Sequence, residues 1–207
     1  MSISSQGRKN MKKSVLLKRF IGVLLLTTGI CLDIASAQAQ DVGIVAGYRS
    51  DYADGDANVT VSSKGNFQGG VVVKFGLSSS LLLRSGLMYT QRAYGFQVPA
   101  LSLNGTIQGS FFEIPVGLLY KFSDYGGVFG GVAPSFGLAK TCSIDGSSQA
   151  CTIGGQSTSP MTIQFGASFK VAPQFGFELY YEQMLAAYAD SVKSPRALVL
   201  QAMVTFD

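Results

Sequence analysis

The chain has 207 residues, with 16 basic and 12 acidic side chains and a formal charge of +4. Six of the basic residues and one acidic residue lie in the first 37 positions, so the rest carries 10 basic and 11 acidic residues, a net charge of −1. This balance argues against a nucleic-acid partner, which requires a basic surface. The chain contains no histidine, which removes Ser-His-Asp and Cys-His catalysis and the usual metal clusters. We therefore expect no catalytic, cofactor or metal site.

Residues 1–37 are typical of a secretory signal peptide. A basic region at 12–19 precedes an apolar run at 20–32, and small residues allow cleavage after Ala37 or Ala39. Met11 is the more natural start of this leader. The apolar run is shorter than the roughly 20 residues that a membrane-spanning helix needs. We expect 1–37 to be removed and 38–207 to form one domain.

Alternating apolar and polar residues predict eight β-strands after the leader. The clearest lies at 110–122, where one face is an unbroken apolar row and the other is small, mixed and charged. About 10 residues in a tilted strand span a bilayer's hydrocarbon core, which this strand can do. The predicted strands are 41–49, 67–77, 81–92, 110–122, 127–140, 161–170, 175–183 and 197–206.

The predicted connections alternate between long and short. Long loops are expected at 50–65, 93–106, 141–160 and 184–195, with tight turns between the remaining strands. An even number of strands, with tight turns at one end and long loops at the other, is the layout of an outer-membrane barrel. The predicted fold class is therefore all-β: an eight-stranded antiparallel up-and-down transmembrane β-barrel.

Alternation alone does not decide which face points outward, because a soluble lipocalin-like barrel shows the same rows reversed. Aromatic residues near the strand ends favour the membrane, as interfacial girdles do. The minor face is rich in Gly, Ser and Thr and carries charges of both signs, which suits a narrow interior. We expect these charges to form an interior network of Lys74, Arg84, Glu113, Lys121, Glu178 and Glu182.

Two features are predicted for the long loops. Cys142 and Cys151 both lie in the third loop, and export to an oxidising compartment favours a disulfide between them over two free thiols. The first loop carries Asp51, Asp54 and Asp56, which predict an acidic tip. Their spacing lacks the Gly and the final Glu of a calcium loop, so a solvated tip is the better interpretation.

The segment FEIPVGLLYKF at 112–122 resembles the conserved strand of small eight-stranded outer-membrane β-barrel proteins, the PorT-like and OmpX-like "porin family". LLLRSGLMYTQRAYGF at 81–96 resembles that family's preceding strand, and VTF at 204–206 resembles its aromatic-ended last strand. The resemblance implies location in the bacterial cell outer membrane, with outer-membrane lipid and the barrel-assembly machinery as partners. The chain departs from the pattern by ending in Asp207 rather than in Phe206.

Two function classes follow from these observations. The first is a non-enzymatic barrel that acts through its extracellular loops in envelope structure or surface interaction, with a loop-binding partner that the sequence does not reveal. The alternative is a small-solute porin or transport protein. An eight-stranded barrel has room only for its own side chains. The inward row is expected to hold bulky Met88, Phe111, Leu119, Tyr180 and Met203, which favours the first class.

Overall fold

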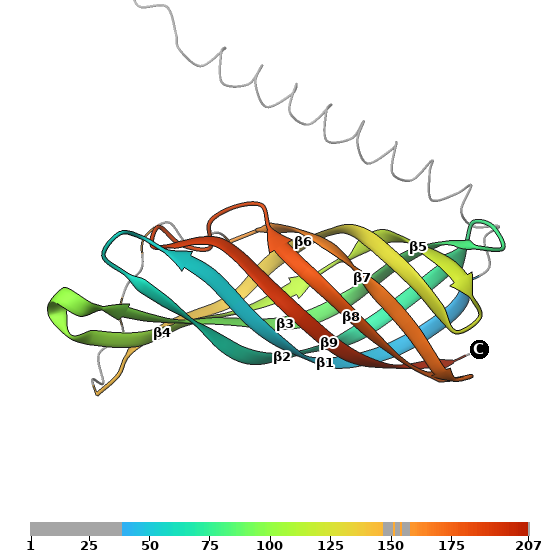
Figure 1. Cartoon of the computed structure of the whole chain (residues 1–207), viewed down its shortest axis with the longest axis horizontal. Coiled ribbons are helices and arrows are strands. Elements are labelled where there is room, and N and C mark those ends of the chain that lie inside the picture. The colour runs from blue at the N-terminus through green and yellow to red at the C-terminus, as the bar shows by residue number, and fades with distance from the viewer. Residues whose placement is uncertain (1–38, 147–150, 152–153, 155–157, 207) are drawn as a thin grey trace, which may run out of the picture. The chain divides into compact units, whose positions relative to one another are not determined.

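The computed structural model describes residues 39–146, 151, 154 and 158–206, and these form one antiparallel sheet (Figure 1). The predicted leader at 1–37 lies outside the described residues. None of the described residues forms a helix that is long and apolar enough to cross a membrane. The elements are β1 (Ala39–Gly55), β2 (Thr60–Gly76), β3 (Leu81–Val98), the 3-10 helix η1 (Pro99–Leu101), β4 (Leu103–Glu113), β5 (Val116–Ser123), β6 (Gly126–Ile144), β7 (Met161–Ala172), β8 (Phe175–Met184) and β9 (Val192–Phe206).

The sheet closes into a barrel, because β1 pairs with both β2 and β9. β4 and β5 share one position in the ring, since both pair with β3 on one side and with β6 on the other. The break between them falls at Ile114 and Pro115, where proline has no N–H to donate to a ladder. The amide of Ile114 instead donates to the carbonyl of Pro134 at 3.0 Å. The predicted eight-position antiparallel barrel is thus confirmed, with one position divided between two strands.

Several strands run further than predicted at one end of the barrel. β1 and β2 leave only 56–59 between them, and β3 and β4 leave only 99–102. The predicted long loops at 50–65 and 93–106 are therefore wrong. The backbone pairing continues there while the outward side chains become polar, so the end of an apolar row does not mark the end of a strand. Figure 1 shows the β3–β4 hairpin projecting from this end of the barrel, which we call the outer end.

The opposite end, called the turn end, carries the short connections at 77–80, 124–125 and 173–174. Serine side chains stabilise two of these turns. The Ser78 hydroxyl accepts a hydrogen bond from the amide of Leu81 at 3.1 Å, and the Ser123 hydroxyl accepts one from the amide of Tyr125 at 3.2 Å. Such side-chain acceptors replace the backbone partners that a tight turn removes. The predicted short turns are therefore present, but 56–59 and 99–102 at the outer end are no longer than 77–80, so the predicted alternation of long and short connections holds only from β5 onward.

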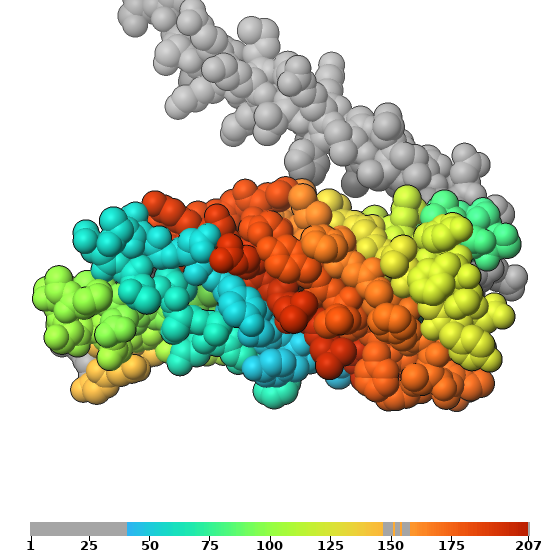
Figure 2. All heavy atoms as spheres, viewed as in Figure 1, coloured from blue at the N-terminus to red at the C-terminus, as the bar shows by residue number. Residues whose placement is uncertain are grey.

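The two faces of the wall differ as the alternation predicts. Large apolar side chains point outward and are exposed, while the inward rows are buried and rich in charged and amide groups. Figure 2 shows the outer surface over β1, β9, β8 and β7 as closely packed side chains in adjacent bands. A water-soluble barrel would have these rows reversed, so the lipocalin-like alternative is wrong. Examples of the exposed row are Ile44, Phe67, Leu87, Leu118, Phe165 and Leu200.

Candidate functional site in the lumen and at the outer end

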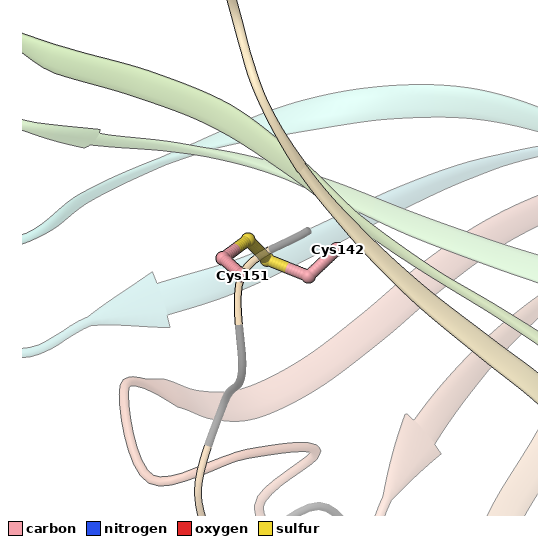
Figure 3. Close-up of a disulfide and its surroundings, with 2 residues drawn as sticks. All are labelled: Cys142 and Cys151. Atoms are coloured by element: carbon pink, nitrogen blue, oxygen red, sulfur yellow. A yellow bond between two sulfur atoms is a disulfide. The ribbon is translucent and has the colours of Figure 1, made fainter. Parts of the chain in front are cut away.

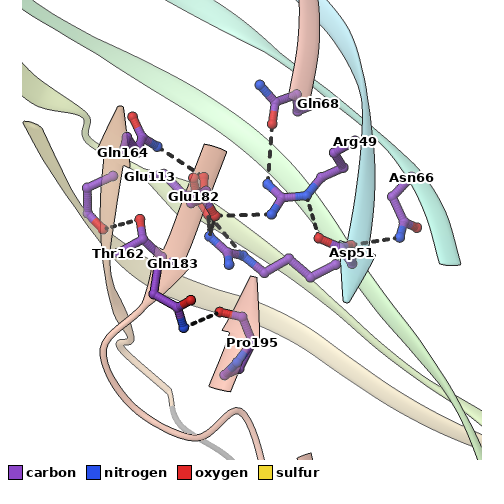
Figure 4. A network of polar contacts seen from close by, with 12 residues as sticks. Arg49, Asp51, Asn66, Gln68, Glu113, Thr162, Gln164, Glu182, Gln183 and Pro195 are labelled. Carbon is purple, nitrogen blue, oxygen red and sulfur yellow. Dashed lines mark hydrogen bonds and ion pairs between the residues drawn. The ribbon is translucent and has the colours of Figure 1, made fainter. Parts of the chain in front are cut away.

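Five buried charged residues fill the lumen toward the outer end. Arg49 donates from Nε to Asp51 at 2.8 Å and from Nη2 to Glu182 at 3.1 Å. Arg92 pairs through Nη2 with Glu113 and with Glu182, in each case at 2.6 Å. Figure 4 shows Arg49 directed at both of its carboxylates. We call these five residues the outer charge cluster, in which two cations face three carboxylates.

Neutral side chains complete the hydrogen bonding of this cluster. Asn66 donates to Asp51 at 3.0 Å, and Gln164 donates to Glu182 at 3.1 Å (Figure 4). The backbone amide of Ala93 also donates to Asp51, at 3.1 Å. Buried charges are tolerated when their remaining hydrogen-bonding positions are filled in this way. The outer charge cluster is therefore a fixed packing element of the lumen rather than a solvated channel lining.

A second group, the inner charge cluster, lies toward the turn end. Arg84 donates from Nη2 to Glu178 at 2.6 Å, and Gln201 donates to the same carboxylate at 2.7 Å. The Arg84 guanidinium also lies 4.7 Å from the ring centre of Phe129. Lys74 completes the cluster, and its ammonium donates to the sulfur of Met203 at 3.4 Å. The inner charge cluster thus holds two cations and one carboxylate, and among the described residues that carboxylate forms its ion pair with Arg84.

Five of the six residues predicted for the interior network are buried, and the sixth, Lys121, is half-exposed at the turn end. The five buried residues are divided between the two clusters, and Arg84 and Glu178 form an ion pair. Three members of the outer charge cluster are absent from the prediction: Arg49, Asp51 and Arg92. The sequence predicts Asp51 at the loop tip, but β1 continues past it and keeps it on the inward row. The alternation in β1 already indicates this position, because Asp51 follows the inward residues Gly47 and Arg49 at the same two-residue spacing.

An apolar group closes the outer end of the lumen. Tyr188 and Ala189, from the connection between β8 and β9, are fully buried there. The Tyr188 ring centre lies 5.1 Å from that of Tyr94 and 6.0 Å from that of Phe111. Gly109 makes room for it, because a Cβ at that position would contact the Tyr188 hydroxyl. We call this group the mouth plug, composed of Tyr94, Ile107, Phe111, Met184, Tyr188, Ala189 and Val192.

The other two residues of the predicted acidic tip, Asp54 and Asp56, are exposed at the β1–β2 hairpin, but each is paired with a cation. Asp54 receives a hydrogen bond from Arg196 at 3.0 Å, and Asp56 receives one from Lys193 at 3.1 Å. The Lys193 hydrogen bond lowers the pKa of the Asp56 carboxyl below its usual value. These exposed pairs link the β1–β2 hairpin to the start of β9. Within the part of the chain that the structure describes, no group of His, Cys, Asp or Glu could hold a metal ion.

Cys142 and Cys151 are joined by a disulfide at the outer end, with their Cα atoms 5.2 Å apart (Figure 3). Cys142 belongs to β6 and packs against the mouth plug. The amide of Cys151 also donates to the carbonyl of Cys142 at 3.4 Å. The predicted third loop at 141–160 begins later than expected, since β6 continues to Ile144, and parts of it lie outside the described residues. The disulfide would tie this connection to the plug.

Mass spectrometry of the purified protein tests the disulfide. Digestion without reductant is expected to release the peptides of Cys142 and Cys151 as one linked species, because the structure places them at bonding distance. The bridge spans only nine positions, so removing it with Cys142→Ser should cost no more than the roughly 3 kcal/mol expected for a 15-residue ring. Complete alkylation of both thiols without reductant would contradict the bridge.

Comparison with known proteins agrees with this geometry. Residues 37–186 match the family model described as "Outer membrane protein beta-barrel domain". Among solved structures, Ail, the attachment invasion locus protein of Yersinia pestis, has a TM-score of 0.53 at 16% identity, covering 80% of this chain and 98% of Ail. Neisserial surface protein A has a TM-score of 0.45 at 13% identity, covering 80% of this chain and 96% of the other.

No curated protein sequence matches the chain. At 16% identity, the likeness to Ail shows a shared barrel fold and nothing further. The family match covers most of the chain, and it agrees with the closed ring, the exposed apolar rows and the charged interior described above. The chain therefore belongs to the outer membrane protein β-barrel domain family and is a protein of the bacterial outer membrane.

Proposed function

We propose that this protein is a non-enzymatic barrel with a closed lumen, acting through its extracellular outer end in envelope structure or surface interaction. The observation that carries the proposal is the filling of the lumen at successive depths by the mouth plug, the outer charge cluster and the inner charge cluster. In this family layout the longer connections face outward, which makes the outer end extracellular.

Amide and phenol groups fill the space between the two charge clusters. Gln68 donates from its amide nitrogen to the Tyr180 hydroxyl and to the Gln201 side-chain oxygen, in each case at 2.6 Å. Its side-chain oxygen accepts from Arg49 at 3.3 Å, which connects the clusters. A solute crossing the barrel would have to break these bonds and separate buried ion pairs. An eight-stranded barrel leaves no second route, because its interior is only wide enough for side chains.

The outer end offers a surface suited to polar contacts. A groove of about 250 Å³ lies across the outer ends of β2, β3 and β4 and the end of β6. Its polar side chains are exposed, and they combine hydroxyl and amide groups with one charge of each sign. This groove supports the surface-interaction reading because it presents donors and acceptors to an extracellular partner. Its polar lining consists of Thr60, Ser62, Lys64, Gln97, Asn104 and Asp145.

The route to the membrane belongs to the same proposal. Residues 1–37 have the pattern of a leader that is removed on export. The last strand ends in the aromatic Phe206, with Val204 and Phe206 on its outward row. We propose that the barrel-assembly machinery recognises this strand during biogenesis, and that outer-membrane lipid then surrounds the apolar rows.

Single-channel recording of the refolded protein in a planar bilayer tests the closed lumen. We expect no stable, reproducible conductance of porin size, because ion pairs and amides block the barrel at several depths. A 16-stranded porin recorded under the same conditions is the positive control.

A Tyr188→Ala variant sharpens the test. It removes the centre of the mouth plug but leaves both charge clusters in place, so it should also remain closed. Reproducible open conductance in the unaltered protein would overturn the proposal and support the small-solute porin. Conductance in Tyr188→Ala alone would show that the plug, rather than the charge clusters, closes the lumen.

A further inference from the structure

A cavity at the turn end of the lumen takes no part in the function proposed above. It has a volume of about 50 Å³ and is lined by residues of β1, β2, β5, β6, β7, β8 and β9 together with the turn at 124–125. A single water needs about 10–15 Å³ on the same measure, so the cavity admits a group of several heavy atoms. Lys74, Thr205, Lys121 and Lys170 are among its lining residues.

Two buried polar groups in this lining lack a full partner. Thr205 is 4% exposed, and among the described residues its hydroxyl has no hydrogen-bond partner. Lys74 is 5% exposed, and its ammonium donates to the sulfur of Met203, which is a weak acceptor. Burying an ammonium without an anionic partner is costly, and so is burying a hydroxyl without any partner. Both groups line the same cavity, so one ligand could satisfy both.

Carboxylates lie near Lys74, but among the described residues none forms an ion pair with it. Glu178 is already engaged by Arg84 at 2.6 Å and by Gln201 at 2.7 Å. Asp41 and Asp124 also line the cavity, but within the described ranges neither forms an ion pair with Lys74. The inner charge cluster therefore keeps one cation more than it has carboxylates, whereas the outer charge cluster has one carboxylate in excess. An anion in the cavity would balance the inner cluster.

We propose that this cavity binds a small oxyanion of the phosphate class from the periplasmic side. Lys74 and Thr205 donate to it from β2 and β9, and Lys121 and Lys170 add positive charge from β5 and β7. Donors that approach from four strands suit a tetrahedral oxyanion better than a planar group. The phosphate belongs either to a free ion of the periplasm or to the headgroup of an inner-leaflet lipid, since both reach this end of the barrel.

Calorimetric titration with inorganic phosphate tests the site, using the refolded protein in a nonionic, phosphate-free detergent at constant ionic strength. We expect saturable binding at one site. Lys74→Gln should weaken binding about tenfold or more, the scale of one lost charged hydrogen bond, and Thr205→Val should weaken it a few-fold. Lys74→Gln should fold, because it removes a buried charge that lacks a carboxylate partner.

Two matched variants serve as controls. Thr90→Val removes another buried hydroxyl that has no hydrogen-bond partner among the described residues, at the position paired with Gln68 between the two clusters, and Lys64→Gln removes an exposed ammonium at the outer end. Both should bind phosphate as the unaltered protein does. Phosphate should also raise the urea midpoint of the unaltered protein more than that of Lys74→Gln, because a ligand of the folded state stabilises it in proportion to its affinity.

Lipid nanodiscs distinguish the two sources of the phosphate group. If phosphatidylglycerol headgroups occupy the site, free phosphate should bind in detergent but not in phosphatidylglycerol discs. If the ligand is a free ion, it should bind equally in both. Absence of saturable phosphate binding in detergent, or equal binding by the unaltered protein, Lys74→Gln and Thr205→Val, would overturn the proposal.

Discussion

Replacing Glu178 with glutamine is expected to lower the free energy of unfolding by about 3–5 kcal/mol, the usual cost of removing one partner of a buried ion pair. Glutamine keeps the size and shape of the side chain, so the loss of stability measures the effect of removing the charge alone. Glu178 accepts from Arg84 at 2.6 Å and is the one carboxylate of the inner charge cluster. In the variant, Arg84 and Lys74 stay buried together without the Glu178 carboxylate. Urea unfolding in lipid vesicles, followed by circular dichroism, measures the change.

A double-mutant cycle identifies the cause. Adding Arg84→Met to Glu178→Gln should recover part of the loss, because it removes the cation that was left unpaired. Strictly additive effects of the two substitutions would contradict the pairing. Glu182→Gln is the matched comparison in the outer charge cluster, where Asp51 and Glu113 still balance the two arginines. We expect its cost to be smaller than that of Glu178→Gln.

The architecture could be predicted because lipid imposes a simple rule on a barrel wall. Every strand must present an apolar row outward over the whole thickness of the bilayer. The row from Phe112 to Phe122 and the row from Val42 to Tyr48 therefore stand out in the sequence, and both point outward in the structure. Strand residues beyond the lipid no longer need an apolar outward row. Beyond that level the outward row turns polar at Asp54 and Ser62, and the pairing continues without a hydropathy signal.

The partners inside the lumen could not be predicted, because they depend on register. Arg49 and Glu182 are 133 positions apart, and they meet only because β1 and β8 lie at matching depths on either side of β9. Each irregularity in the ladders shifts that depth by a residue or more, such as the one between Ser63 and Gln68 in the pairing of β2 with β3. Alternation therefore identifies an inward charge but not the charge that faces it.

Replacing Leu87 with arginine is expected to cost about 2–4 kcal/mol of folding free energy, the range for a cation on the lipid face near the bilayer midplane. Leu87 lies on the outward row of β3 and is 53% exposed. It pairs across the sheet with Val71, another outward apolar residue, so an arginine there has no polar neighbour on its face. The aromatic Tyr89 follows it toward the outer end, where it packs edge-on against Phe112. Folding into vesicles, assayed by urea titration, measures the cost.

Gln97→Arg is the matched control, because Gln97 lies on the same face of the same strand but beyond the apolar row, where it is exposed. The same side chain there should change stability little, since it meets water rather than lipid. An inward glycine such as Gly117 is unsuitable as a control, because a Cβ at that position would contact the carbonyl of Gly130. Equal tolerance of arginine at 87 and 97 would show that lipid does not cover the β3 face. If arginine destabilises the barrel at position 87 but not at 97, the exposed apolar rows must face the bilayer core.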